Sequence, residues 1–75
     1  MIMSTRKEGN LFYDSEMGRY DIRFGLEEHY GGLHCGECFE VKADQGWVPV
    51  RIEMGDDWYL VGLPNIRLDG LTVRI

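Results

Sequence analysis

Short segments in which apolar and polar residues alternate, separated by turns, constrain this fold more than any other feature of the sequence. The longest is 47–54, in which every even-numbered residue is apolar. A period of two is typical of a β-strand with one buried face. Similar segments, bounded by turn-forming residues such as Gly and Asp, lie at 9–14, 19–24, 38–43 and 71–75. The sequence therefore predicts an all-β domain of five or six short antiparallel strands.

Three stretches depart from this alternation. Residues 58–62 are apolar on both faces, so we expect that strand to lie centrally in the sheet or under a cover. Residues 25–34 contain three glycines and no regular pattern, so we expect one irregular loop there. A proline interrupts the pattern before the last strand, and we expect a 3₁₀ turn near 64–67.

The 75 residues are enough for one domain with a small core. We expect a flexible N-terminus at 1–8 and a single domain at 9–75. A closed or partly open barrel is favoured at this size because closure removes exposed sheet edges. Two landmarks, the Gly36-Glu37 turn before one strand and the irregular turn after Leu63, occur in an order that resembles the SH3-like small barrel.

Charge and hydropathy favour some partners over others. The chain has a net charge of −5, and its eight basic residues are scattered. Because nucleic-acid binding depends on clustered Lys and Arg, we expect no nucleic-acid partner. No apolar run is long enough to span a membrane, and the first residues lack the apolar core of a signal peptide. These features predict a cytoplasmic protein without a membrane partner.

The sequence around Gly36 contains both cysteines and one histidine. A pair of thiolates two residues apart can hold zinc, and the candidate metal ligands are Cys35, Cys38, His29 and His34. A redox dithiol is a second interpretation, although a strand rather than a helix follows the pair. The third is that both cysteines are small packing residues on either side of a turn at Gly36-Glu37. The third interpretation fits best and predicts no cofactor, with structural zinc as the alternative.

The candidate binding residues are aromatic and basic. If the even-numbered residues of 47–54 face inward, Trp47 faces outward, and the SH3 resemblance implies that a Trp at this place lines a peptide groove. Tyr59 and Arg51 are the other expected contacts. The alternative is that Trp47 covers one end of the barrel or packs under the loop at 25–34. The sequence shows no catalytic triad or phosphate-binding loop, so we expect a protein or peptide partner and no enzymatic activity.

Three motifs resemble a family of short Firmicutes proteins of unknown function that are often found on mobile elements. These motifs are Gly18 to Ile22, Leu33 to Val41 and Asp57 to Gly62. The resemblance implies no established activity or site. The sequence also allows an acidic decoy that occupies the nucleic-acid site of another protein, and it fits either a monomer or a homodimer.

Overall fold

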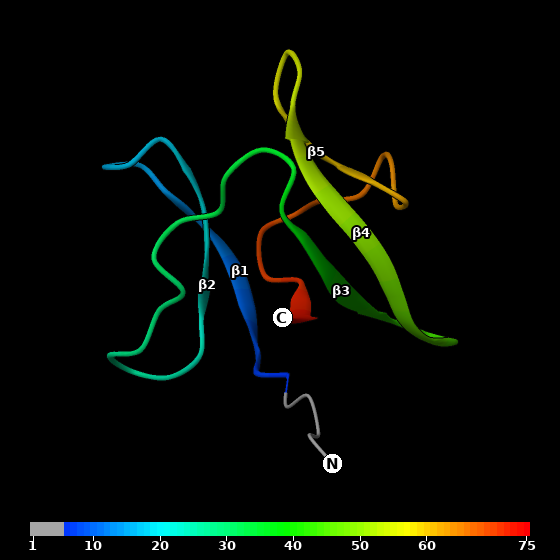
Figure 1. Cartoon of the computed structure of the whole chain (residues 1–75), viewed down its shortest axis with the longest axis horizontal. Helices are drawn as coiled ribbons and strands as arrows, with labels where there is room; N and C mark the ends of the chain where they lie inside the picture. The colour runs from blue at the N-terminus through cyan, green and yellow to red at the C-terminus, as the bar shows by residue number, and fades with distance from the viewer. Residues whose placement is uncertain (1–5) are drawn as a thin grey trace.

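The computed structural model describes residues 6–75 and shows six antiparallel strands in one sheet (Figure 1). The strands are β1 (Glu8–Asp14), β2 (Arg19–Arg23), β3 (Cys38–Ala43), β4 (Gly46–Met54), β5 (Trp58–Val61) and β6 (Thr72–Arg74). Their order across the sheet is β2-β1-β6-β3-β4-β5. No helix is present in this part of the chain. The predicted all-β fold of short antiparallel strands is confirmed.

The first hairpin forms because its turn residues supply the required hydrogen bonds. The Oδ1 atom of Asp14 accepts the N–H groups of Glu16 and Met17, at 3.0 and 3.3 Å. Gly18 has φ +69° and donates its N–H to the carbonyl of Asp14 at 2.8 Å. An Asp that bonds to the backbone ahead of it and a Gly with positive φ are a common turn combination. The turn joins β1 to β2 at the pair Asp14 and Arg19.

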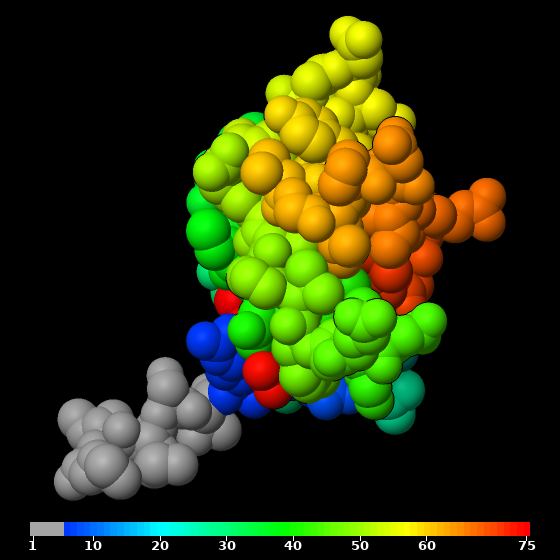
Figure 2. Space-filling view, turned by 90° about the vertical axis from the view of Figure 1, so that its right-hand side faces the viewer, coloured from blue at the N-terminus to red at the C-terminus, as the bar shows by residue number. Residues whose placement is uncertain are grey.

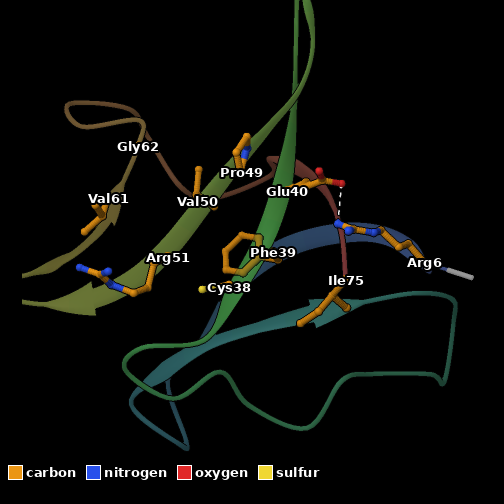
Figure 3. A pocket seen from close by; sticks show the side chains of 10 residues that line it. All are labelled: Arg6, Cys38, Phe39, Glu40, Pro49, Val50, Arg51, Val61, Gly62 and Ile75. Carbon is orange, nitrogen blue, oxygen red and sulfur yellow. Dashed lines mark ion pairs between the residues drawn. The ribbon is translucent and has the colours of Figure 1, made fainter. Parts of the chain in front are cut away.

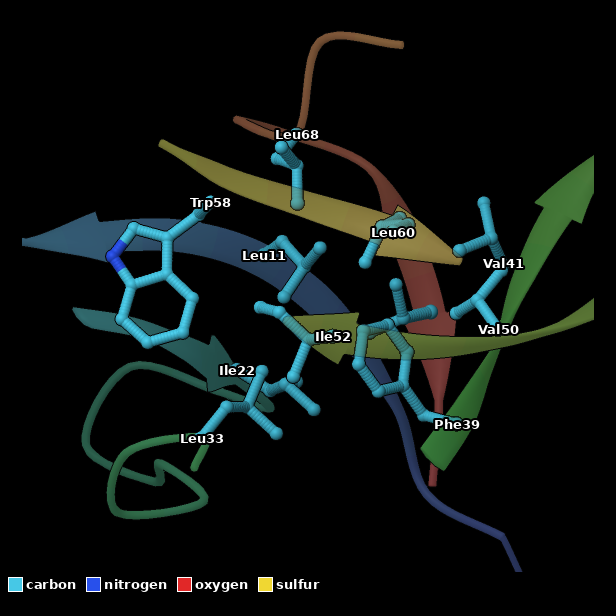
Figure 4. Close-up of a cluster of buried hydrophobic side chains, with 11 residues drawn as sticks. Leu11, Ile22, Leu33, Phe39, Val41, Val50, Ile52, Trp58, Leu60 and Leu68 are labelled. Atoms are coloured by element: carbon cyan, nitrogen blue, oxygen red, sulfur yellow. The ribbon is translucent and has the colours of Figure 1, made fainter. Parts of the chain in front are cut away.

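The core lies on one face of the sheet, which curls around it. All six strands and two connecting segments contribute to it (Figure 4): Leu11, Ile22, Leu33, Phe39, Val41, Val50, Ile52, Trp58, Leu60, Leu68 and Val73. The inward positions of β3 and β4 follow the predicted alternation over most of their length. Met54, at the end of β4, is half-exposed because the β4–β5 turn projects from the body of the molecule (Figures 1 and 2).

The prediction that 58–62 lies centrally or under a cover is wrong. β5 is at one end of the strand order, beside β4 only. Trp58 and Leu60 face the core, whereas Tyr59 and Val61 remain 44% and 38% exposed. The second apolar face of this strand therefore lies on the surface.

The irregular loop at 25–34 is confirmed, and it covers the free edge of β2. Tyr30 and Leu33 donate their N–H groups to the carbonyls of Ile22 and Tyr20, at 2.9 and 2.8 Å. A buried carboxylate holds the end of the loop, because Asp21 Oδ1 accepts the N–H groups of Gly31 and Gly32 at 2.9 and 2.8 Å. β2 and β5 do not pair, so the sheet is open between them.

The turn after β5 and the N-terminal segment differ in part from what the sequence predicted. Pro64 and Asn65 form a turn in place of the expected 3₁₀ turn, and Asn65 has φ +63°. In the segment expected to be flexible, residues 1–5 lie outside the described part. Lys7 exchanges two backbone hydrogen bonds with Ile75, both of 3.0 Å, and β1 begins at Glu8.

Candidate functional site

The outward side of β3 and β4 carries most of the candidate residues. Their register places Cys38 opposite Arg51, Glu40 opposite Pro49, and Lys42 opposite Trp47. β6 adds Arg74 beside Glu40, and β5 adds Val61 beside Arg51 and Tyr59 beside Glu53. We call this surface the outer face, and its residues are Cys38, Glu40, Lys42, Trp47, Pro49, Arg51, Glu53, Tyr59, Val61 and Arg74, with Glu8 and Arg6 at its margin.

Trp47 is half-buried against charged residues of the outer face. The guanidinium of Arg74 lies over its ring, 4.3 Å from the ring centre. Arg74 Nε donates to Glu40 Oε1 at 2.6 Å, and an N–H of Arg6 reaches the same oxygen at 2.7 Å. The hydrogen bond from Arg74 lowers the pKa of Glu40, and the charge of Arg6 acts in the same direction. Four residues from three strands and the N-terminal segment are thereby held in one network.

Arg51 and Tyr59 lie further along the same face. Arg51 Nε donates to Glu53 Oε2 at 2.7 Å. Tyr59 pairs with Glu53, which is six residues from Trp47 on the same strand. At about 3.4 Å per residue, Trp47 and Tyr59 are roughly 20 Å apart. The structure thus brings the three predicted binding residues onto one face, as a row and not as a single pocket.

A hollow of about 700 Å³ lies within this row (Figure 3). Arg51, Pro49 and Cys38 line it from β4 and β3, and Val61 closes one side from β5. Arg6 reaches Glu40 at the other side. Neither Trp47 nor Tyr59 lines the hollow, but each lies two residues along its strand from a residue that does, Pro49 and Val61 respectively.

Pro49 fits here because β4 is an edge strand at that point. Ile52 donates its N–H to Glu37 and accepts the N–H of Gly36, so its backbone groups face the β3 side. These groups alternate along a strand, so those of Pro49 face away from β3. β5 pairs only with Arg51–Met54, which leaves no neighbour that requires the missing N–H. Pro49 therefore lies where β4 has no strand partner on the side away from β3.

The four candidate zinc ligands do not meet in one cluster. In residues 6–75, no group of three His, Cys, Asp or Glu side chains has a metal-binding arrangement. His29 packs edge-on against Phe12, with ring centres 5.6 Å apart, and its backbone pairs with Arg23. Cys35 and Cys38 are free and exposed, and the Nδ1 atom of His34 lies 3.4 Å from Glu37.

The turn that contains the cysteines is one residue earlier than expected. Glu37 donates its N–H to the His34 carbonyl at 3.1 Å, which places Cys35 and Gly36 at the corner. Gly36 has φ +93°, a conformation that suits glycine at the third position of such a turn. Cys38 is therefore the first residue of β3, with its side chain on the outer face.

Glu37 holds the turn that contains the cysteines, a role that the sequence did not predict. Its carboxylate accepts the His34 N–H at 2.7 Å and the Tyr30 hydroxyl through its other oxygen. Burial opposes ionisation of Glu37, but the hydrogen bonds from Tyr30 and His34 outweigh it and lower the pKa of Glu37. The only available signal was an acidic residue three positions after His34, which is too common a pattern to single out.

The strand order and the outer face define a small antiparallel β domain with an aromatic and basic surface. A family model described as a domain of unknown function (DUF5348) matches residues 9–75. The chain belongs to this family, as the predicted resemblance to a family of unknown function implied. The SH3-like pattern and the link to mobile elements stay predictions.

A solved structure supports the fold. The chain is similar to a crystal structure of a protein from Ruminococcus gnavus, determined by a structural genomics consortium, with 76% sequence identity and a TM-score of 0.87. The match covers 91% of this chain and 99% of that one. A search of curated proteins gives no match. Within residues 6–75, there is no helix that could cross a membrane.

Proposed function

We propose that this domain is a protein-interaction module without catalytic activity, which binds a partner protein through the outer face. The observation that carries the proposal is the row formed by Trp47, Arg51 and Tyr59 around a hollow on a single face. Aromatic residues and Arg are enriched in protein interfaces and often dominate the binding energy. The row is therefore composed of the residue types that most often anchor a partner.

The dimensions of the row suit an extended peptide. A span of roughly 20 Å corresponds to about six residues of extended chain. The hollow offers Pro49, Cys38 and Val61 to an apolar side chain, and the ends of the row offer aromatic rings. A peptide lying along the row would contact all three predicted residues.

The state of the cysteines bears on the cellular compartment. Both cysteines are free and exposed, which suits a reducing compartment such as the cytoplasm.

The positions of the other acidic residues give less support to the decoy hypothesis than to the interaction module. These residues lie mostly in turns and loops, such as Glu16, Glu27, Asp44 and Asp56, and not in a row along one strand face.

A peptide-display selection against the immobilised domain tests the proposal. We expect enriched peptides to bind the wild-type protein and the Arg67→Ala control, which changes an exposed arginine in the segment after β5. The same peptides should bind Arg51→Ala and Tyr59→Ala at least about tenfold more weakly, as expected for interface anchors. Equal binding to all four proteins would refute the outer face as the binding surface.

A further inference from the structure

Basic residues are concentrated on the outer face. Four of the eight in the chain lie there: Arg6, Lys42, Arg51 and Arg74. The acidic residues of this face are Glu8, Glu40 and Glu53. The rest of the chain has four basic and ten acidic residues. The outer face is therefore positively charged on a protein whose other surfaces are strongly acidic.

The guanidinium groups on this face are oriented but retain free donors. Each guanidinium has five N–H donors in a fixed plane. Arg74 uses its Nε on Glu40 and stacks on Trp47, which fixes the orientation of that plane. Arg6 binds the same carboxylate oxygen. Planar guanidinium N–H donors with a fixed orientation suit bidentate binding of a carboxylate.

Lys42 adds a free positive charge next to this network. It is exposed, it lies directly opposite Trp47, and it forms no ion pair with any residue between 6 and 75. The Trp47 end of the row thus combines an aromatic ring with three cations, Arg6, Lys42 and Arg74, and two carboxylates, Glu8 and Glu40.

We propose that the partner presents an acidic, extended segment, with its carboxylates at the Trp47 end of the row and an apolar side chain in the hollow. This inference rests on the proposed function and adds the chemistry of the ligand. Complementary charge sets the specificity of an interface and its rate of association. A peptide fits better than a nucleic acid, because Glu8, Glu40 and Glu53 interrupt the positive charge and would repel a continuous phosphate backbone.

Fluorescence anisotropy with three labelled peptide pools tests this inference. The pools share a varied apolar and aromatic centre, and their flanking residues are Asp/Glu, Asn/Gln or Lys/Arg. We expect the acidic pool to bind about tenfold more tightly than the neutral one and to lose affinity as salt is raised. Lys42→Gln and Arg74→Gln should reduce this preference, whereas Arg67→Gln should retain it. Circular dichroism checks that each variant is folded.

The other outcomes separate this inference from the proposed function. If the neutral or basic pool binds the outer face at least as tightly as the acidic pool, the acidic partner is refuted and the interaction module stands. If a labelled oligothymidylate binds more tightly than the acidic pool, the ligand is a nucleic acid and the inference is wrong. If no pool binds at all, the inference fails, and the display selection decides on the proposed function.

Discussion

Single carboxylates hold the irregular parts of this domain in place. Asp21 is 4% exposed, and its Oδ1 accepts the N–H groups of Ile22, Gly31 and Gly32. Glu37 holds the next turn through His34 and Tyr30. Buried donors without a partner are costly, so one acceptor that serves several of them determines the path of a loop. Neither role was visible in the sequence, because these contacts join residues up to eleven positions apart in a segment without periodicity.

Asp21→Ala should destabilise the domain by about 1–3 kcal/mol, because it leaves the buried N–H groups unsatisfied. Chemical denaturation measures this loss, and hydrogen exchange at Gly31 and Gly32 should accelerate. Asp21→Asn is the matched control, since it retains an oxygen at the same position. If the alanine variant is as stable as the wild type, the carboxylate does not anchor the loop.

Stability should fall in acid because two carboxylates have a lowered pKa in the folded state. The hydrogen bonds to Glu37 and Glu40 favour their charged forms, so the unfolded chain binds protons at a higher pH than the folded one. Their contribution is fully present above the ordinary carboxyl pKa and is lost as pH falls through the lowered values. Thermal unfolding between neutral pH and about pH 3 should show a smaller acid loss for Glu37→Gln than for wild type. Glu27→Gln, in the exposed loop, should behave as the wild type does.

At the scale of strands, alternation predicted which residues face the core but not which strands are neighbours. It placed Val50 and Ile52 inside and Trp47 and Arg51 outside, as observed. It did not place β5 at the edge, because a strand that is apolar on both faces has the same pattern whether it is central or exposed. The stacking of Arg74 on Trp47 was also beyond prediction, since these residues are far apart in the chain and meet only through the β3–β6 pairing.

The end of β5 depends on one glycine. Gly62 has φ +112°, and a Cβ atom there would lie 2.7 Å from the Pro49 carbonyl oxygen. Gly62→Ala should therefore lower the free energy of unfolding by about 1–3 kcal/mol, through backbone strain and this clash. Gly25→Ala is the control, because that position has open space and no positive φ. Equal urea midpoints for the two variants would contradict this account of the turn.

At the scale of the whole molecule, one tryptophan belongs to the core and the other to the candidate binding surface. Trp58 is buried in a core of eleven side chains, and Trp47 lies on the outer face. Trp58→Ala should cost about 3–5 kcal/mol, which is most of the stability of a domain this small. Trp47→Ala should retain the native fold, because the Trp47 side chain lies on the outward side of β4 and is not part of the core.

Circular dichroism melts of both variants test this difference. The expected result is a cooperative transition close to that of the wild type for Trp47→Ala, and a greatly lowered or missing transition for Trp58→Ala. An unfolded Trp47→Ala protein would show that the outer face is part of the stabilising core and would remove its main candidate anchor.

A second hollow is the main alternative to the outer face as a binding site. It has a volume of about 680 Å³ and lies beside Phe12, Phe24 and His29, with Leu26 86% exposed at its margin. It is comparable in size to the hollow of the outer face, but it contains none of the three predicted binding residues. Any map of binding must therefore distinguish these two surfaces.

The most direct test is to titrate a display-selected peptide into the ¹⁵N-labelled domain and map the shifts of its amide and indole signals. We expect the Trp47 indole signal and the amide signals of Cys38, Arg51 and Tyr59 to shift together and saturate at one peptide concentration. Shifts confined to Phe12, Phe24 and His29, with the Trp47 signals unchanged, would place the binding site in the second hollow and rule out the outer face.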